Sequence, residues 1–153
     1  MMSDLPQRQR LYHQPPEWVD EDAVYFMTVG CASRGVSQPD QTAPFEVMVR
    51  AIDCYEASGK WRMMIFLTMP DHRHEMVQFP KPENMEKILR DWKRYVAKRA
   101  GIVWQDGFFE HRLRSRQSAE EKWHYIRQNP VRKSLVDLPE KWRFVRYANE
   151  TAR

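Results

Sequence analysis

Two histidines stand two positions apart, at His72 and His74 in the segment TMPDHRH. The segment has the composition of a β-strand, in which side chains two positions apart leave the same face of the sheet. Both imidazoles can then reach one divalent metal ion, for which neutral imidazole is a common ligand. The spacing therefore predicts a shared metal, and a pair of ordinary hydrogen-bonded histidines is the alternative interpretation.

A tyrosine and an asparagine stand four positions apart in the helical segment SAEEKWHYIRQNP. Tyr125 lies about 100° of rotation from Ile126, outside the apolar stripe, and Asn129 follows one turn later on the same face. A phenolic oxygen and an amide oxygen then project side by side, as a nucleophile and a further metal ligand would need to. A tyrosine at the edge of the stripe, with its hydroxyl in water, is the alternative. The apolar stripe itself is formed by Ala119, Trp123 and Ile126.

The elements that must position these groups follow the order β-α-β-β-α-β-α. Apolar, β-branched and aromatic runs predict strands at residues 24–31, 61–69 and 72–79, and a last strand made of residues 102–104 and 108–113, broken at Asp106-Gly107. Apolar residues at helical spacing predict helices at residues 44–59, 84–100 and 118–129. The last helix has a capping-box spacing at Ser118 and Glu121, and Pro130 is expected to end it. We expect an α+β fold, a ferredoxin-like antiparallel sheet with two helices on one face and an additional C-terminal helix that carries Tyr125.

A chain of 153 residues with 42% apolar content has the material for one compact core, so we expect a single domain. Its expected parts are a surface arm at residues 1–22, a ferredoxin-like core at 23–113, the tyrosine helix at 118–129 and a C-terminal tail at 130–153. The sequence shows neither a signal peptide nor a run of roughly 20 apolar residues, so we expect a cytoplasmic protein without a membrane partner. Cys31 and Cys54 lack CxxC spacing and are expected to be buried thiols.

The formal net charge of +4 is unevenly distributed. Residues 1–85 hold 8 Lys or Arg against 12 Asp or Glu, whereas residues 86–153 hold 17 against 9. A basic half with interspersed aromatic residues suits a nucleic-acid backbone with unstacked bases, and a merely solvated surface is the alternative. One predicted helix carries a basic row opposite its apolar stripe, formed by Lys87, Arg90, Arg94 and Lys98.

Several segments, taken in order, resemble a known group of enzymes. The histidine pair in TMPDHRH is preceded by RLYHQPPEW and YFMTVGCASR, and it is followed by WQDGFFEHRLRS and EKWHYIRQNPVRKSLV. Over about residues 8–147 the chain resembles the HUH one-tyrosine transposases, and more narrowly the REP-associated tyrosine transposases. No single motif is decisive, but several in the right order with family-like separations are collectively specific.

The resemblance implies a metal-dependent endonuclease and strand transferase acting on single-stranded DNA. It implies that His72 and His74 bind a divalent ion, that Asn129 completes the metal site and that Tyr125 is the nucleophile. Tyr125 would attack the scissile phosphate to form a 5′-phosphotyrosine, and the freed 3′-hydroxyl would later reverse the step, as in DNA transposition. Two imidazoles with an amide oxygen suit Mg²⁺ or Mn²⁺ better than tetrahedral zinc, so we expect one of these two ions.

The expected partner is single-stranded or hairpin DNA, and the resemblance implies repetitive extragenic palindromes as its source. Relatives act as monomers or as homodimers that share a helix, and the sequence is compatible with both. The basic residues expected to hold DNA phosphates near the site are Arg112, Arg114, Arg116, Arg127, Arg132 and Lys133.

Two positions depart from the pattern of this group. Arg73 stands between the histidines where a hydrophobic residue is usual, and Glu75 follows on the same strand face. We expect this face to meet solvent, with Arg73 paired to Glu75 or in contact with DNA. Ser134 stands where glycine is common, and we expect a minor backbone adjustment there.

Two other functions compete with the enzyme. A hairpin-binding protein domesticated from a transposase would bind DNA without cutting it, and Arg73 would then mark a weakened metal site. A ferredoxin-like RNA-binding domain would need exposed aromatic residues on its strands. The candidates for that role, which we expect to be core residues instead, are Tyr25, Phe26, Phe66 and Phe79.

Overall fold

The computed structural model describes residues 24–32 and 39–148 of the chain. The predicted surface arm at residues 1–22 lies outside the described residues. The elements are β1 (Val24–Gly30), α2 (Thr42–Ala57), β2 (Arg62–Met69), β3 (His72–Gln78), η2 (Pro82–Asn84), α3 (Met85–Ala100), β4 (Phe109–Leu113), α4 (Arg116–Arg132), η3 (Pro139–Lys141) and β5 (Val145–Tyr147).

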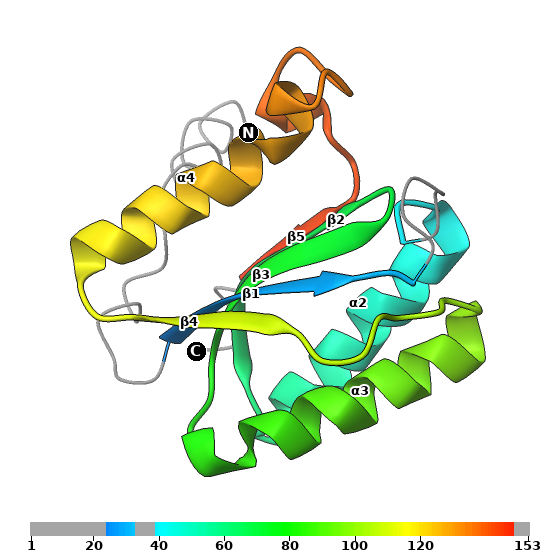
Figure 1. The fold of residues 1–153 in the computed structure, drawn as a ribbon, viewed down its shortest axis with the longest axis vertical. Helices are drawn as coiled ribbons and strands as arrows, with labels where there is room; N and C mark the ends of the chain where they lie inside the picture. The colour runs from blue at the N-terminus through cyan, green and yellow to red at the C-terminus, as the bar shows by residue number, and fades with distance from the viewer. Residues whose placement is uncertain (1–23, 33–38, 149–153) are drawn as a thin grey trace, which may run out of the picture.

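The strands form one antiparallel sheet in the order β4-β1-β3-β2-β5. The first four have the order of a ferredoxin-like sheet, in which two βαβ units interleave so that their helices share one face. Figure 1 shows α2 and α3 on one side of the sheet and α4 on the other. The predicted α+β fold is therefore confirmed. The sequence placed residues 102–104 in the last strand, but only Trp104 pairs there, in an isolated bridge with Cys31.

Each face of the sheet has its own apolar core, because successive side chains of a strand point to opposite faces. The core under α2 and α3 is rich in aromatic residues, among them Trp61, Phe66 and Trp92. The core under α4 includes Leu67, Met76, Trp123 and Ile126. The second core fixes the position of α4 and, with it, the position of Tyr125.

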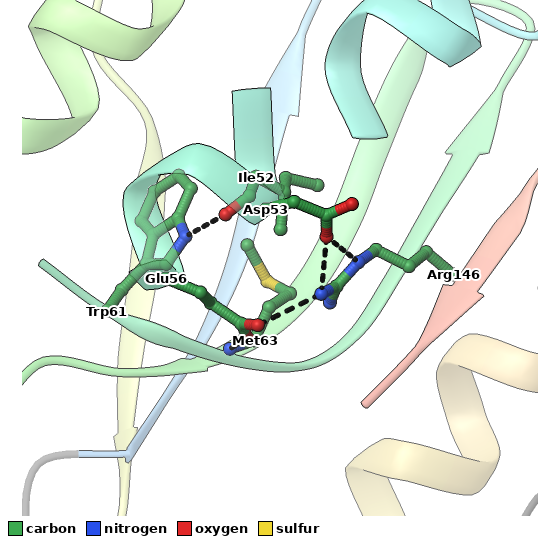
Figure 2. Close-up of polar contacts among 6 residues, drawn as sticks. All are labelled: Ile52, Asp53, Glu56, Trp61, Met63 and Arg146. Atoms are coloured by element: carbon green, nitrogen blue, oxygen red, sulfur yellow. Dashed lines mark hydrogen bonds and ion pairs between the residues drawn. The ribbon is translucent and has the colours of Figure 1, made fainter. Parts of the chain in front are cut away.

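The segment predicted as a C-terminal tail contributes β5, which pairs with β2 at the sheet edge. Arg146 of β5 donates to Asp53 of α2 at 2.8 Å and to Glu56 at 3.0 Å (Figure 2). Glu56 also accepts the backbone N–H of Met63 in β2 at 2.7 Å. Tyr147, the last residue of β5, packs against Trp123 of α4 on the other face of the sheet. This short strand therefore ties both helical layers to the sheet.

Helix α4 begins earlier than predicted, at Arg116 rather than Ser118. Ser115 is the N-cap, and its Oγ accepts the backbone N–H of Ser118 at 3.0 Å. The predicted capping box of Ser118 and Glu121 is therefore wrong, because Ser115 already caps the helix by accepting the N–H of Ser118.

Helix α4 also ends later than predicted, at Arg132, with Pro130 inside its last turn. There Pro130 costs the helix a single donor, and the N–H of Lys133 still reaches the carbonyl of Asn129 at 3.1 Å. Two residues past the helix end, Ser134 has a φ of 62°, in the left-handed region. This conformation favours glycine, which explains why glycine is common at this position in the group that the sequence resembles. Ser134 adopts the same conformation with a Cβ.

The face of β3 that carries Arg73 and Glu75 is fully buried, contrary to the expectation of a solvent-facing pair. Arg73 Nε donates to Glu75 Oε1 at 2.7 Å, and the guanidinium carbon lies 4.4 Å from the ring centroid of Trp92 and 4.8 Å from that of Trp104. Burial lowers the pKa of Arg73 and raises the pKa of Glu75, so it opposes both charges. Alternating polar residues predict exposure, and only the tertiary packing shows that each charge is buried with its partner.

Cys31 is buried as expected, whereas Cys54 is exposed on α2. The side of α2 that faces the sheet is formed by Met48, Ala51 and Ile52, which leaves Cys54 on the outer side. Among the described helices, none combines the length and the apolar character needed to cross a membrane.

Candidate active site on the α4 face of the sheet

His72 and His74 converge at the start of β3, as their spacing predicted. Their Nε2 atoms are 3.2 Å apart. Two nitrogen ligands of one ion, each about 2.1 Å from it, lie about 3.0 to 3.4 Å apart at octahedral or tetrahedral angles. The two Nε2 atoms are at hydrogen-bonding distance, and their separation also matches that of neighbouring ligands in one coordination sphere.

The remaining ring nitrogens of the pair have hydrogen-bond partners. His72 Nδ1 lies 2.8 Å from Asp71 Oδ1, and His74 Nδ1 lies 2.9 Å from Thr28 Oγ1. Because a carboxylate only accepts, His72 Nδ1 donates, and the Nε2 of neutral His72 keeps its lone pair. The Thr28 hydroxyl can donate to His74 or accept from it, so it supports either tautomer of that ring. Such partners orient metal-binding imidazoles in proteins.

His74 is the more buried of the two histidines. Its ring stacks on Phe26, with centroids 5.8 Å apart. Burial is the largest cause that lowers the pKa of His74, to about 3, and the charges of His72, Arg132 and Lys122 act in the same direction. The imidazole is therefore neutral at physiological pH, the state in which it can bind a metal.

Tyr125 projects from α4 toward this pair. Its ring centroid lies 6.1 Å from that of His74 and 6.1 Å from that of Phe26. The side chain is 44% exposed, so it is not a core residue and solvent or substrate can reach it. Two cations flank the ring, Lys122 Nζ at 5.4 Å and the guanidinium carbon of Arg132 at 4.1 Å from its centroid. The structure thus places a reachable tyrosine beside the histidines in a positively charged setting.

Asn129 is buried one turn after Tyr125, and its side-chain oxygen accepts from Arg132 Nη2 at 3.4 Å. The same Arg132 nitrogen donates to the carbonyl of Tyr125 at 2.8 Å. The structure therefore links Asn129 to the tyrosine through Arg132. Its role as a metal ligand stays a prediction. Within residues 24–32 and 39–148, no three His, Cys, Asp or Glu side chains form a metal cluster.

The structure separates the basic residues that the sequence grouped as DNA contacts. Arg132 is at the tyrosine, and Arg114 and Lys133 are exposed at the two ends of α4. Arg116 opens the helix and pairs with Glu120 at 3.4 Å. Arg112 alternates with the core residue Leu113 on β4, which directs it to the other face of the sheet.

Arg127 lies elsewhere than expected, because it is only 4% exposed. Its Nε donates to the hydroxyl of Tyr147 at 2.9 Å, and its guanidinium carbon lies 5.6 Å from the ring centroid of Trp123. It links α4 to β5 and does not present its charge to a surface ligand. Helical periodicity did not reveal this, since the burying partner comes from a strand that the sequence did not predict.

Sequence reasoning missed Thr28, Asp71 and Lys122 as neighbours of the site. A usable signal existed for Thr28, since it is the polar residue within an otherwise apolar strand. Lys122 precedes Tyr125 by three positions, a spacing that places both on one helix face. The aromatic residues considered for RNA binding, Tyr25, Phe26, Phe66 and Phe79, are all buried, as expected.

Comparisons with known proteins identify one similar protein and one similar solved structure. No family model matches the chain. A protein of Escherichia coli (strain K12) described as "REP-associated tyrosine transposase" is 23% identical over 132 residues, which are 84% of this chain and 79% of that protein. The chain resembles the REP-associated tyrosine transposases. A solved structure, "Structure of the REP associates tyrosine transposase bound to a REP hairpin", superimposes with a TM-score of 0.72. It is 23% identical and covers 81% of this chain and 76% of that one. The likeness to a REP-associated tyrosine transposase establishes the fold and leaves the activity to be argued from the site.

Proposed function

We propose that this chain nicks and rejoins single-stranded DNA beside a hairpin, through a covalent intermediate on Tyr125. One observation carries the proposal: a solvent-accessible tyrosine lies next to two histidines whose Nε2 atoms are 3.2 Å apart. Resemblance to tyrosine transposases supports it. The proposed class is an HUH-type DNA endonuclease and strand transferase.

The histidine pair fits a divalent ion. His72 Nε2 and the neutral ring of His74 offer two nitrogen donors at ligand-to-ligand spacing, and Thr28 and Asp71 hold the outer nitrogens. Mg²⁺ or Mn²⁺ held by His72 and His74, with Asn129 as a further ligand, would neutralise the charge that develops on the scissile phosphate. The residues themselves fix the orientation of both rings before DNA arrives.

The covalent step follows from the position of Tyr125. Its phenolic oxygen forms a bond to the phosphorus while the bond from phosphorus to the 3′-oxygen breaks. The proton lost by the phenol is matched by the proton that the leaving 3′-oxygen gains to become a hydroxyl. Attack by a 3′-hydroxyl on the phosphotyrosine reverses these changes and joins strands. Arg132 and Lys122 bring positive charge to the ring from which the nucleophile projects.

The proposed substrate is a DNA hairpin with flanking single strand, of the repetitive extragenic palindrome type. The structural relative is described as bound to a REP hairpin. In this chain, Arg132 lies against the ring of Tyr125, and the exposed Arg114 and Lys133 at the two ends of α4 would contact phosphates along the same helix. Arg112 and Arg127 are left out of this proposed surface, because one points to the opposite face and the other is buried.

The competing function is hairpin binding without cutting. In this alternative, Arg73 between the two histidines marks a weakened metal site. In the structure Arg73 lies on the face of β3 opposite the histidines, in the core under α3. Its presence therefore does not remove a ligand or crowd the histidine pair.

A covalent-capture assay tests the proposal. End-labelled DNA with a palindromic hairpin and single-stranded flanks is incubated with the protein in Mn²⁺ or EDTA and resolved on a denaturing gel. We expect a metal-dependent protein–DNA adduct that is absent in Tyr125→Phe. Tyr95→Phe is the matched control, because Tyr95 on α3 is 43% exposed and Tyr125 is 44% exposed.

Each outcome of this assay has a clear meaning. An adduct that survives in Tyr125→Phe would identify another nucleophile. Tight hairpin binding without an adduct or a cut strand, across several flanking sequences and with Mg²⁺ as well as Mn²⁺, would reject the enzyme in favour of the binding protein.

A further inference from the structure

A groove of about 670 Å³ runs between α3 and the segment that precedes β4, on the side of the sheet away from the histidines. Apolar side chains of this segment, Ile102, Trp104 and Phe108, line it together with basic residues of α3. A groove of this size can hold a nucleotide or two, since small-ligand sites span about 300 to 1,000 Å³.

One hydrogen-bonding side chain, Lys93, joins the two walls of the groove. Lys93 of α3 donates to the carbonyls of Gln105 and Gly107, both at 2.9 Å, and so holds the segment against the helix. Trp104 is fixed on the side that faces the core, because the guanidinium of the buried Arg73 packs on its ring. The wall therefore has an ordered aromatic residue with apolar neighbours.

The α3 wall of the groove is positive, with Arg90, Lys93 and Arg94 against Glu86, and Asp106 of the facing segment adds one negative charge. Helix α3 holds six Lys or Arg against two acidic residues. Arg90 and Arg94 line the groove one helical turn apart, about 6 Å along the axis. Lys87 and Lys98 belong to the same row but lie outside the groove. Aromatic residues beside a row of cations are the combination that binds unpaired nucleotides, through stacking and phosphate contacts.

The groove is connected to the site of Tyr125 around the sheet edge. Phe108 lines the groove, and the next residue, Phe109, begins the edge strand β4 and is 60% exposed. The ring of Phe109 contacts Phe26, with centroids 6.3 Å apart, and Phe26 in turn contacts Tyr125. A strand of DNA that leaves Tyr125 over the exposed ring of Phe109 would cross one edge strand to reach the groove.

We propose that this groove binds an unpaired stretch of the DNA strand, with a base against Trp104 and Phe108 and phosphates on Arg90 and Arg94. The inference rests on the proposed function for its substrate class. It adds a second contact region, on the opposite face of the sheet from the cleavage site, which would hold single-stranded flank and not the hairpin.

Equilibrium binding of a labelled oligothymidylate of about 12 nucleotides tests the groove. It is measured by fluorescence anisotropy in EDTA, so that no strand is cut. The test variant is Arg90→Glu with Arg94→Glu, and the control is Lys87→Glu with Lys98→Glu, which makes the same charge change on the same helix outside the groove. All four side chains are exposed, and thermal unfolding verifies that both variants fold.

We expect the groove variant to lose at least about tenfold in affinity and its salt slope to fall by about 1.4, as for two lost phosphate contacts on a single strand. The control variant is expected to lose clearly less. Equal losses in both variants would show diffuse attraction to a basic helix and overturn the proposal.

Photo-crosslinking of an iodouracil-substituted oligonucleotide provides a second readout. We expect peptides containing residues 102–108 to carry the crosslink, and crosslinks confined to other segments would overturn the proposal. Failure of the proposed function is distinguishable, because it appears as a missing Tyr125 adduct in the wild-type protein while oligothymidylate binding persists.

Discussion

Arg132 covers the ring of Tyr125 and donates to the carbonyl of the same residue at 2.8 Å. One side chain thus fixes the backbone of the proposed nucleophile and brings a positive charge to 4.1 Å from its ring centroid. The contact spans the last two turns of α4, and it exists only because the helix continues past Pro130 to Arg132.

Replacement of Arg132 by Ala is expected to slow adduct formation by about two- to fivefold, because a cation over an exposed aromatic ring contributes about 0.5 to 1 kcal/mol. The rate of adduct formation with labelled DNA measures this effect. Lys133→Ala is the matched control, since Lys133 is exposed and adjacent in sequence. An equal loss in both variants would mean that only the total charge near the helix end matters.

Replacement of Thr28 by Val is expected to weaken Mn²⁺ binding by about 10- to 100-fold, as for other residues that orient a metal-binding imidazole. The substitution keeps the shape of the side chain but removes the hydroxyl that lies 2.9 Å from His74 Nδ1. Isothermal titration with Mn²⁺ measures the effect without DNA. Thr28→Ser restores the hydroxyl and is expected to restore affinity, and a Ser variant as weak as the Val variant would contradict this role.

The buried pair of Arg73 and Glu75 makes a prediction about stability. Glu75→Gln leaves a buried guanidinium without its counter-charge and is expected to lower the free energy of unfolding by about 3 to 5 kcal/mol. Arg73→Met with Glu75→Leu removes both charges and is expected to cost far less or to stabilise. Urea unfolding measures both variants.

Asp91→Asn provides the control for that pair, because it breaks the exposed ion pair with Lys87 and is expected to change stability little. If the double replacement destabilised the protein as much as Glu75→Gln, the pair would contribute more through its specific packing than its burial costs.

At Ser134 a substitution is expected to stabilise the protein, because the φ of 62° strains a residue that has a Cβ. Ser134→Gly is expected to raise the free energy of unfolding by about 0.5 to 1 kcal/mol, the cost of a left-handed residue less the greater chain entropy of glycine. Ser134→Ala keeps the Cβ and is expected to bring no gain. A stabilising Ala variant would show that the serine hydroxyl, and not the backbone, is unfavourable there.

Much of the site was predictable because its signals are local. The two-residue spacing of His72 and His74 places both on one strand face whatever surrounds the strand. The position of Tyr125 off the apolar stripe predicts its exposure in the same way. The end of α4 was less predictable, since a proline in the last turn ends a helix in one context and is tolerated in another.

Residues that depend on distant partners were not predictable. Arg127 has the same sequence signature as an exposed arginine, and only β5 supplies the tyrosine that buries it. Arg73 and Glu75 look like a solvent-facing pair until α3 and Trp104 close over them. In both cases a charged residue is buried with a partner, which hydrophobic patterning does not detect.

The sequence by itself determined the order of the first four strands and the three α-helices, the common face of the two histidines and the exposure of Tyr125, because each follows from repeat spacing within one element. Only the tertiary structure decided that α4 crosses β1 and β3 so that Tyr125 meets His74, because that approach depends on the packing of Trp123 and Ile126 into a core built from several strands. The tertiary structure also placed the basic side of α3 beside Trp104, since the two come from segments that meet only when the sheet and helices are assembled.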